Sequence, residues 1–243
     1  MKNKPQILHE DDDIIIVNKP PFFLTIPDRY APEKENLYAW LNAKYGKVFI
    51  VHRLDKETSG VLIFAKNEAT HRDLSRQFEA RTVSKTYLTL VDGVVHVDEG
   101  TVDKPIRLHQ NGFRMVVAKD GKRSLTTYKV IERFKNFTLL EAGIQTGRLH
   151  QIRIHLESIG YPLAIDSVYG RREGFLLSEI KGRKYRRGKG EYSEDERPLM
   201  KRVILHSYRL IIDHPTSRER LTFEAELPKD FAAVMKQLRR WGK

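Results

Sequence analysis

Short apolar runs of strand length recur along this 243-residue chain, and they constrain its fold more than any other feature. The runs are rich in β-branched and aromatic residues, and some alternate apolar with polar positions. We expect strands at residues 13–18, 48–51, 60–65, 85–91, 126–132, 137–144, 203–213 and 220–227. Helical periodicity is found at 68–80, 147–158 and 230–240. Strands in runs with helices between them predict an α+β fold, with a largely antiparallel mixed sheet and flanking helices.

The composition excludes several classes of protein. Apolar residues make up 40% of the chain, enough for one sizeable core, but no apolar run is long enough to span a membrane. Residues 1–13 are polar and acidic, unlike a signal peptide, so we expect a cytoplasmic protein. The chain has no cysteine, which rules out disulfides, thiolate nucleophiles and cysteine-ligated metal centres. We expect residues 1–243 to form a single domain that acts as a monomer.

The chain carries a formal net charge of +12 at pH 7. Such an excess of cations attracts polyanions, and RNA and DNA are the commonest polyanions in a cytosol. The alternative is that the charge serves solubility. Charge alone favours a nucleic-acid partner over that alternative.

One basic segment interrupts the order of strands and helices. We expect residues 171–201 to form a surface insertion of low order. Such a cationic loop can bind an RNA backbone, or it can be a solvated insertion balanced by the acidic residues that follow. The first interpretation assigns six cations to RNA binding: Lys181, Arg183, Lys184, Arg186, Arg187 and Lys189.

The segment 52–60 lies between two expected strands, so it is predicted to be a loop held at the edge of a sheet. It contains Asp55, flanked by the cations Arg53 and Lys56. Loops on a rigid scaffold are where catalytic groups usually sit. The alternative is that the Asp55 side chain caps a turn by accepting from the amide of Glu57 or Thr58.

Arg153 lies within the expected helix 147–158, whose apolar residues Leu149, Ile152 and Leu156 form one stripe. At the rim of this stripe, a guanidinium that cannot lose its proton must find an anion or water. Arg153 can therefore extend outward to solvent, or it can bind a carboxylate in a cleft. Asp55 is a candidate for that carboxylate.

Taken together, these segments and several others resemble the RluA-type pseudouridine synthases. The resemblance covers roughly residues 7 to 232, with its motifs in the family's order. The matching segments are Asn18-Lys19-Pro20, His52-Arg53-Leu54-Asp55 with Thr58-Ser59-Gly60, Ser84-Lys85-Thr86-Tyr87 with Val91-Asp92-Gly93, Thr146-Gly147-Arg148, His150-Gln151-Ile152-Arg153 with His155-Leu156, Leu205-His206 with His214-Pro215, and 227–231.

The resemblance implies the pseudouridine synthase catalytic fold with a central RNA-binding cleft, and an enzyme that isomerises uridine in ribosomal or transfer RNA. It implies that Asp55 is the catalytic carboxylate, that Tyr87 packs on the target base, and that Arg153 pairs with Asp55. Without the resemblance, Tyr87 would be a core tyrosine of its strand. Because a stacked base must be turned out of folded RNA, Arg53 either fills the gap left behind or contacts a phosphate.

We also assign His52, Arg148 and His150 to RNA binding. The chain differs from the family in two places: Ile165-Asp166 stands where the family has Gly-Asp ahead of Tyr169-Gly170, and the basic insertion is longer than usual. We expect no S4-type RNA-binding module ahead of the catalytic domain.

We expect no metal and no nucleotide cofactor. His150 and His155 are five residues apart, not the four that places two ligands on one helical face, and no phosphate-binding Gly-rich loop is present. Two rival functions remain, a non-catalytic RNA-binding factor and a metal-dependent nuclease. The presence of Asp55 argues against the first, and the missing carboxylate–histidine cluster argues against the second.

Overall fold

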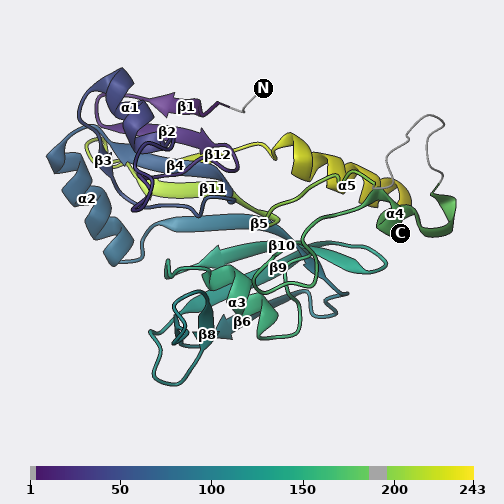
Figure 1. Ribbon diagram of the computed structural model, residues 1–243. Helices are drawn as coiled ribbons and strands as arrows, with labels where there is room; N and C mark the ends of the chain where they lie inside the picture. Colours follow the sequence, from purple (N-terminus) through teal and green to yellow (C-terminus); the bar gives the residue numbers. More distant parts are fainter. Residues whose placement is uncertain (1–3, 186–195) are drawn as a thin grey trace.

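The computed structural model describes residues 4–185 and 196–243 (Figure 1). Its helices are α1 (Leu37–Tyr45), α2 (Glu68–Glu79), α3 (Gln151–Glu157), α4 (Leu177–Lys181), the short 3-10 helix η1 (Gly182–Lys184) and α5 (Lys229–Trp241). Its strands are β1 (Gln6–Glu10), β2 (Ile14–Lys19), β3 (Phe49–Ile50), β4 (Ser59–Ala65), β5 (Ser84–Asp92), β6 (Glu99–Asp103), β7 (Ile106–Leu108), β8 (Met115–Val117), β9 (Leu125–Arg133), β10 (Phe137–Ile144), β11 (Leu205–Asp213) and β12 (Arg220–Glu224).

One mixed sheet forms the centre of the described chain. Its strands run in the order β1-β2-β4-β11-β5-β10-β9-β6, with β12 paired to β11 and β3 paired to β4. Every pairing is antiparallel except that between β4 and β11. The expected α+β fold with a largely antiparallel mixed sheet is therefore confirmed.

The strands β2 and β4 are buried on both faces, which explains their unbroken apolar sequences. Side chains alternate between the two faces of a strand. Ile15 and Val17 of β2 belong to the main core with Leu37 of α1, whereas Ile14 and Ile16 belong to a second core with Leu74 of α2. The helices α1 and α2 therefore cover opposite faces of this half of the sheet.

The parallel pairing of β4 with β11 depends on a glycine. Gly60 pairs with Ser207, and a Cβ on Gly60 would lie 2.0 Å from the Ser207 carbonyl oxygen. Gly60 also has a φ of 113°, which other residues rarely adopt. The two strands can approach this closely only with glycine here, which gives a physical reason for the Thr58-Ser59-Gly60 motif.

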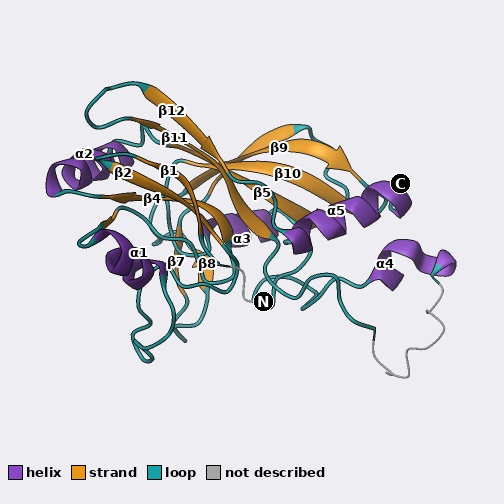
Figure 2. Ribbon diagram, turned by 90° about the horizontal axis from the view of Figure 1, so that it is seen from above, coloured by secondary structure: helices purple, strands orange, loops and turns teal. Residues whose placement is uncertain are grey.

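The other half of the sheet is packed on its inner side by α3 and α5. Ile152 and Leu156 of α3 and Phe231 of α5 join the main core with β5 and β10 residues such as Leu90. Figure 2 shows α3 beneath the middle of the sheet and α5 toward the end opposite α1 and α2. The site described below lies where the two halves of the sheet meet.

Two expectations about helices are corrected by the structure. The helix expected at 147–158 begins only at Gln151, because His150 adopts a left-handed conformation with φ 52°. Leu149 is consequently outside the helix and 39% exposed. In the basic insertion, the described part is ordered as α4 and η1, where low order was expected.

Among the described residues, no helix has both the length and the apolar character needed to cross a membrane.

Candidate active site

A small pocket lies at the junction of the two halves of the sheet. Its walls come from the loop between β3 and β4, from Tyr87 on β5, from the end of β10, from the start of α3 and from Leu205 on β11. The pocket brings together Arg53, Asp55, Tyr87, Arg148, His150 and Arg153. Segments distant in the sequence thus converge on the residues that the motifs indicated.

The loop that carries Asp55 is fixed through its backbone. The Thr25 hydroxyl donates to the Leu54 carbonyl at 3.0 Å, and the Lys19 ammonium donates to the Lys56 carbonyl at 3.0 Å. The Arg202 guanidinium donates to the Glu57 carbonyl, also at 3.0 Å. Carbonyls on both sides of Asp55 are therefore held by separate side chains, so the position of Asp55 is set by the scaffold.

Two of these donors are charged groups inside the protein. The Lys19 ammonium is fully buried and also donates to the carbonyls of Pro20 and Phe23, so its three hydrogens are all bonded. Burial and the nearby Arg202 charge together lower the pKa of Lys19 to about 7, although the Asp55 charge opposes the shift. Arg202 is bound by the Asp230 carboxylate of α5 through two hydrogen bonds of 2.6 and 2.9 Å.

The Asp55 carboxylate itself is left free for chemistry. The turn after it is closed by the Thr58 amide, which donates to the Asp55 main-chain carbonyl at 3.1 Å. The side chain therefore does not cap this turn, and the alternative that it does so is wrong. The carboxylate is 28% exposed, with His150 Nε2 3.8 Å and an Arg153 terminal nitrogen 4.0 Å from one of its oxygens.

Arg153 is buried and forms its principal ion pair with a residue that the sequence analysis did not assign to the site. Its Nε and one terminal nitrogen donate to the two Asp166 oxygens at 2.6 and 2.7 Å, while Asp55 is only within ion-pair distance. Such a two-point geometry is characteristic of strong arginine–carboxylate pairs. The pair fixes the guanidinium, whose remaining nitrogen points its positive charge at Asp55.

Asp166 also organises the turn that follows it. One of its oxygens accepts from the amides of Val168 and Tyr169 at 2.9 and 3.1 Å. The preceding Ile165, which stands where the family has glycine, is buried in the main core, and its carbonyl accepts from the Ile204 amide. The turn therefore forms with a branched residue at this position. In the sequence, the position of Asp166 three residues before the Tyr169-Gly170 pair could have pointed to its place at the site.

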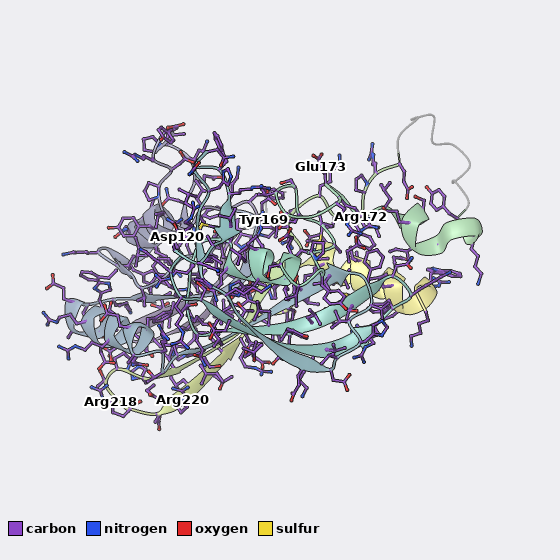
Figure 3. The ribbon with its side chains drawn as sticks, turned by 90° about the horizontal axis from the view of Figure 1, so that it is seen from below. Asp120, Tyr169, Arg172, Glu173, Arg218 and Arg220 are labelled. Carbon is purple, nitrogen blue, oxygen red and sulfur yellow. The ribbon has the colours of Figure 1, made fainter. Side chains whose placement is uncertain are left out.

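The tautomer of His150 follows from the position of Tyr169. The Tyr169 hydroxyl oxygen accepts from the Met115 amide at 2.7 Å and lies 3.1 Å from His150 Nδ1. Because the hydroxyl hydrogen needs an acceptor, it is donated to Nδ1, and the neutral ring carries its proton on Nε2. Burial and the nearby Arg153 charge lower the pKa of His150, which favours this neutral form. Nε2–H then faces the pocket and Asp55 as a donor; Figure 3 shows Tyr169 next to α3.

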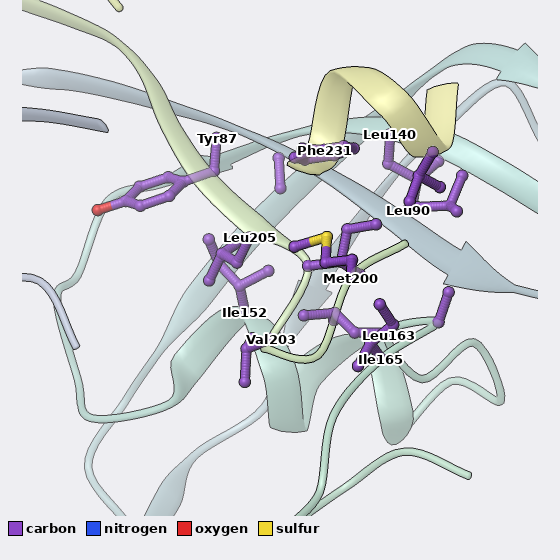
Figure 4. Close-up of a cluster of buried hydrophobic side chains, with 14 of the residues drawn as sticks. Tyr87, Leu90, Leu140, Ile152, Leu163, Ile165, Met200, Val203, Leu205 and Phe231 are labelled. Carbon is purple, nitrogen blue, oxygen red and sulfur yellow. The ribbon is translucent and has the colours of Figure 1, made fainter. Parts of the chain in front are cut away.

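Tyr87 lies at the edge of the main core, on the side of Leu205 and Ile152 (Figure 4). Its hydroxyl points away from these apolar side chains. Burial, and then the charge of Asp55, raise the pKa of Tyr87, so its phenol stays protonated at neutral pH.

The basic side chains at the pocket differ in the interactions that they form with the rest of the protein. Arg53 and Arg148 are exposed and form no hydrogen bond or ion pair through their side chains with any described residue. His52, by contrast, stacks on Phe78 with ring centroids 4.9 Å apart and accepts from the Ile63 amide. Burial lowers its pKa to about 3, so the ring is neutral. Its packing explains the position of His52 without RNA, and RNA binding by His52 stays a prediction.

The described cations of the insertion lie away from the pocket. Lys181 and Lys184 each place their ammonium over the ring of Trp241 in α5, at 5.3 and 5.8 Å from its centroid. Figure 1 shows α4 and the end of α5 at one end of the molecule. Arg186, Arg187 and Lys189 lie outside the described residues, as does the side chain of Arg183.

Gln151 is a further residue at the site that the sequence analysis did not single out. It is buried, and its amide oxygen accepts from the Thr146 hydroxyl at 2.7 Å and from the Arg148 amide at 3.2 Å. Its amide nitrogen donates to Leu125 and Thr126 of β9. One side chain thus ties the loop of Arg148 and His150 to the sheet.

The arrangement has a clear chemical capability. It presents one unbonded carboxylate, an arginine that stabilises its negative charge, a neutral histidine donor and a flat aromatic ring around one small space. A carboxylate so placed can capture or stabilise an electron-deficient sugar carbon.

Comparisons with known proteins identify the family of the chain. A family model described as RNA pseudouridylate synthase matches residues 13–158. The uncharacterized RNA pseudouridine synthase YlyB of Bacillus subtilis is 37% identical over 97% of this chain and 73% of its own length. Ribosomal large subunit pseudouridine synthase D of Nitrosomonas europaea is 39% identical over 96% of this chain and 65% of its own length.

A solved structure shares the fold. Human RNA Pseudouridylate Synthase Domain Containing 4 superposes with a TM-score of 0.72 at 24% identity, covering 96% of this chain and 92% of the human chain. The expected pseudouridine synthase fold is therefore confirmed. With a family match over more than half of its residues and curated relatives at 37–39% identity, the chain belongs to the RNA pseudouridylate synthase family.

Proposed function

We propose that this protein converts a uridine of structured RNA to pseudouridine, with Asp55 as the catalytic carboxylate, Tyr87 as the packing surface for the base and Arg153 as the stabilising cation. The observation that carries the proposal is the unbonded Asp55 carboxylate, held through its backbone beside the buried Arg153. The names of the relatives favour ribosomal RNA of the large subunit as substrate, with transfer RNA as the alternative.

The proposed reaction balances without a co-substrate. The bond between sugar C1′ and uracil N1 breaks, the detached base rotates, and C1′ bonds to ring carbon C5. C5 then loses its proton, and N1 gains one. No net electrons, water or leaving group are required, so the reaction needs neither a redox cofactor nor a nucleotide.

The RNA must present its target base to a small pocket. A base stacked within folded RNA cannot reach the pocket, so we propose that it is turned out. The unpaired Arg53 at the rim is suited to this step, either by stacking in the vacated place or by binding a phosphate. Arg148, which also lines the pocket and has no ionic partner among the described residues, is suited to binding the RNA backbone at a second point. We also propose that residues 1–243 act as a monomeric catalytic domain in the cytoplasm.

The experiment that tests the function is a comparison of pseudouridine maps. RNA from a strain lacking the gene should lose one or a few pseudouridines, and the purified protein should restore them in unmodified transcripts. Unchanged maps, together with no product in vitro, would favour the rival function of a non-catalytic RNA-binding factor.

We expect full activity in excess EDTA without added nucleotide. The proposed chemistry uses a carboxylate and needs no Lewis acid, and the described residues form no group of three His, Asp or Glu side chains suited to a metal ion. Product formation should be measured with a substrate RNA whose fold in EDTA is verified separately. A loss of activity that a divalent ion restores, with the RNA still folded, would contradict the expectation.

We also expect the basic segment 181–189 to contribute to RNA affinity. Replacing its six cations by Ser or Gln should weaken binding and reduce the slope of log affinity against log salt by about 0.7 to 0.9 for each phosphate that is no longer neutralised. Turnover at saturating RNA should change little. Because Lys181 and Lys184 also pack on Trp241, a variant that changes only the four cations at 183, 186, 187 and 189 separates RNA binding from packing. An unchanged affinity and slope would show that the segment does not bind RNA.

A further inference from the structure

Lys85 is a largely buried cation beside the pocket that the mechanism above does not use. It precedes Tyr87 by two positions on β5, so both side chains point to the same face of the sheet. The Lys85 side chain reaches the Phe78 ring of α2, with its ammonium 5.2 Å from the ring centroid. It also lies beside Gly147, since a Cβ added there would be 3.9 Å from the ammonium nitrogen.

This ammonium has no anionic or hydrogen-bonding partner among residues 4–185 and 196–243, although Lys85 is only 9% exposed. His52 is the titratable group next to it, and the acceptor nitrogen of His52 is already used by the Ile63 amide. Burial alone lowers the pKa of Lys85 to about 8, with no described carboxylate offsetting the shift. Lys19, Arg153 and Arg202, the other buried cations of this region, each donate hydrogen bonds to carbonyl or carboxylate oxygens.

Most of the Lys85 side chain is buried, but its ammonium nitrogen is not fully enclosed, so a ligand can reach it. Partial loss of hydration around a charge that has no ionic partner costs folding free energy, so packing alone does not explain this lysine. Its surroundings also favour an anion. Gly147 leaves the space above the ammonium open, and the unpaired Arg148 follows directly in the chain. With Arg53 on the catalytic loop, three cations that lack an ionic partner in the described chain lie in or beside the pocket.

We propose that Lys85 binds a phosphate of the substrate RNA, next to the nucleotide that enters the pocket. This inference rests on the proposed function, because it requires RNA in the cleft. It assigns the α2 side of the cleft, between His52 and Gly147, to the path of the RNA backbone. The phosphate supplies the ionic partner that Lys85 lacks among the described residues. Lys85 therefore increases the affinity for RNA and lowers the folding stability of the free protein.

The test measures RNA affinity in an inactive background, so that binding is not mixed with turnover. The full chain with Asp55→Asn, alone or combined with Lys85→Met, is titrated with an unmodified large-subunit rRNA transcript at several salt concentrations. With one phosphate fewer neutralised, affinity should fall about five- to tenfold near 0.1 M salt, and the salt slope should decrease by about 0.7 to 0.9. Lys129→Met is the control, since Lys129 is an exposed lysine that pairs across the strands with Glu141 and does not line the active-site pocket.

The pH dependence gives a second readout with a defined sign. Below pH 8 the Lys85 ammonium is protonated and binds fully; as pH rises through about 8 the free protein loses this proton, so affinity should fall. Lys85→Arg keeps its charge and should bind RNA with a flatter pH profile between pH 7 and 9.

The possible outcomes distinguish a failure of the Lys85 inference from a failure of the proposed function. Failure of the Asp55→Asn protein to bind both this transcript and a transfer RNA transcript would remove the proposed function, and the Lys85 inference with it. Normal binding together with unchanged affinity and salt slope in Lys85→Met would overturn the Lys85 inference alone. A fall in melting temperature with the salt slope intact would also overturn it, because a phosphate-binding lysine predicts an equal or higher melting temperature after replacement.

Discussion

Replacement of Asp55 by Asn is expected to abolish pseudouridine formation, lowering turnover by at least about three orders of magnitude. Asn has nearly the same shape but carries no negative charge, so it can neither capture the sugar carbon nor stabilise positive charge on it. The Asp55 backbone, held by Thr25, Lys19 and Arg202, should keep its position. The effect should therefore be on chemistry and not on folding.

The measurement is single-turnover product formation, with RNA affinity determined in parallel. Affinity should stay within a few-fold of wild type, because the cations that bind the RNA are unchanged. Lys56→Gln is a suitable control: it alters the next residue in the loop, whose side chain is exposed, and it leaves the Lys56 carbonyl in place. Substantial turnover by the Asp55 variant would show that another group performs the chemistry.

Replacement of Asp166 by Asn should produce the second large effect, a loss of about 3–5 kcal/mol in the free energy of unfolding. The Asp166 side chain is fully buried and the Arg153 side chain is 6% exposed, so the substitution leaves a buried guanidinium without its counter-charge. Asn keeps an oxygen for the Val168 and Tyr169 amides, which confines the change to the charge. Urea unfolding measures the loss.

Asp120→Asn is the matched control for this experiment. Asp120 also binds an arginine, Arg107, but its side chain is 72% exposed, and an ion pair in water contributes little to stability. An equal destabilisation by the two substitutions would contradict a special role for burial at Asp166.

A double variant separates stability from catalysis at the same pair. Replacing both Arg153 and Asp166 by apolar residues of similar size, Arg153→Met with Asp166→Leu, should restore much of the lost stability, because no unpaired charge remains. Activity should stay low, because the positive charge that faces Asp55 is gone. Recovery of activity with stability would show that the pair serves only to hold the fold.

The expected strands were placed well where burial is complete. The strands β2, β4, β5, β10 and β11 have long apolar or β-branched sequences, and their bounds lie within two residues of those expected. The strands β1 and β6 were missed because they lie at the edges of the sheet. In β6 only Val102 is buried, so the strand has almost no apolar pattern to detect.

The candidate catalytic site, like the sheet, was predicted only in part. Asp55, Tyr87 and Arg153 converge on one pocket, as the motif resemblance implied. The principal partner of Arg153 could not be found from periodicity, because Asp166 lies in a turn outside the helix. Likewise, no local pattern shows that His150 adopts a left-handed conformation. The helix therefore begins only at Gln151, and Leu149 lies outside it. Both features come from tertiary interactions with Tyr169 and the loop 165–170.

The parallel pairing of β4 with β11 has a consequence for how the enzyme is made. Asp55 leaves the ribosome early, but Arg202, Leu205 and the strand that meets Gly60 are synthesised about 150 residues later. A nascent chain that stops before Arg202 therefore carries the carboxylate without the donor to Glu57, the wall at Leu205 or the neighbouring strand. Such a chain lacks part of the pocket around Asp55. Catalytic competence thus arises late in translation, when the central strand is inserted.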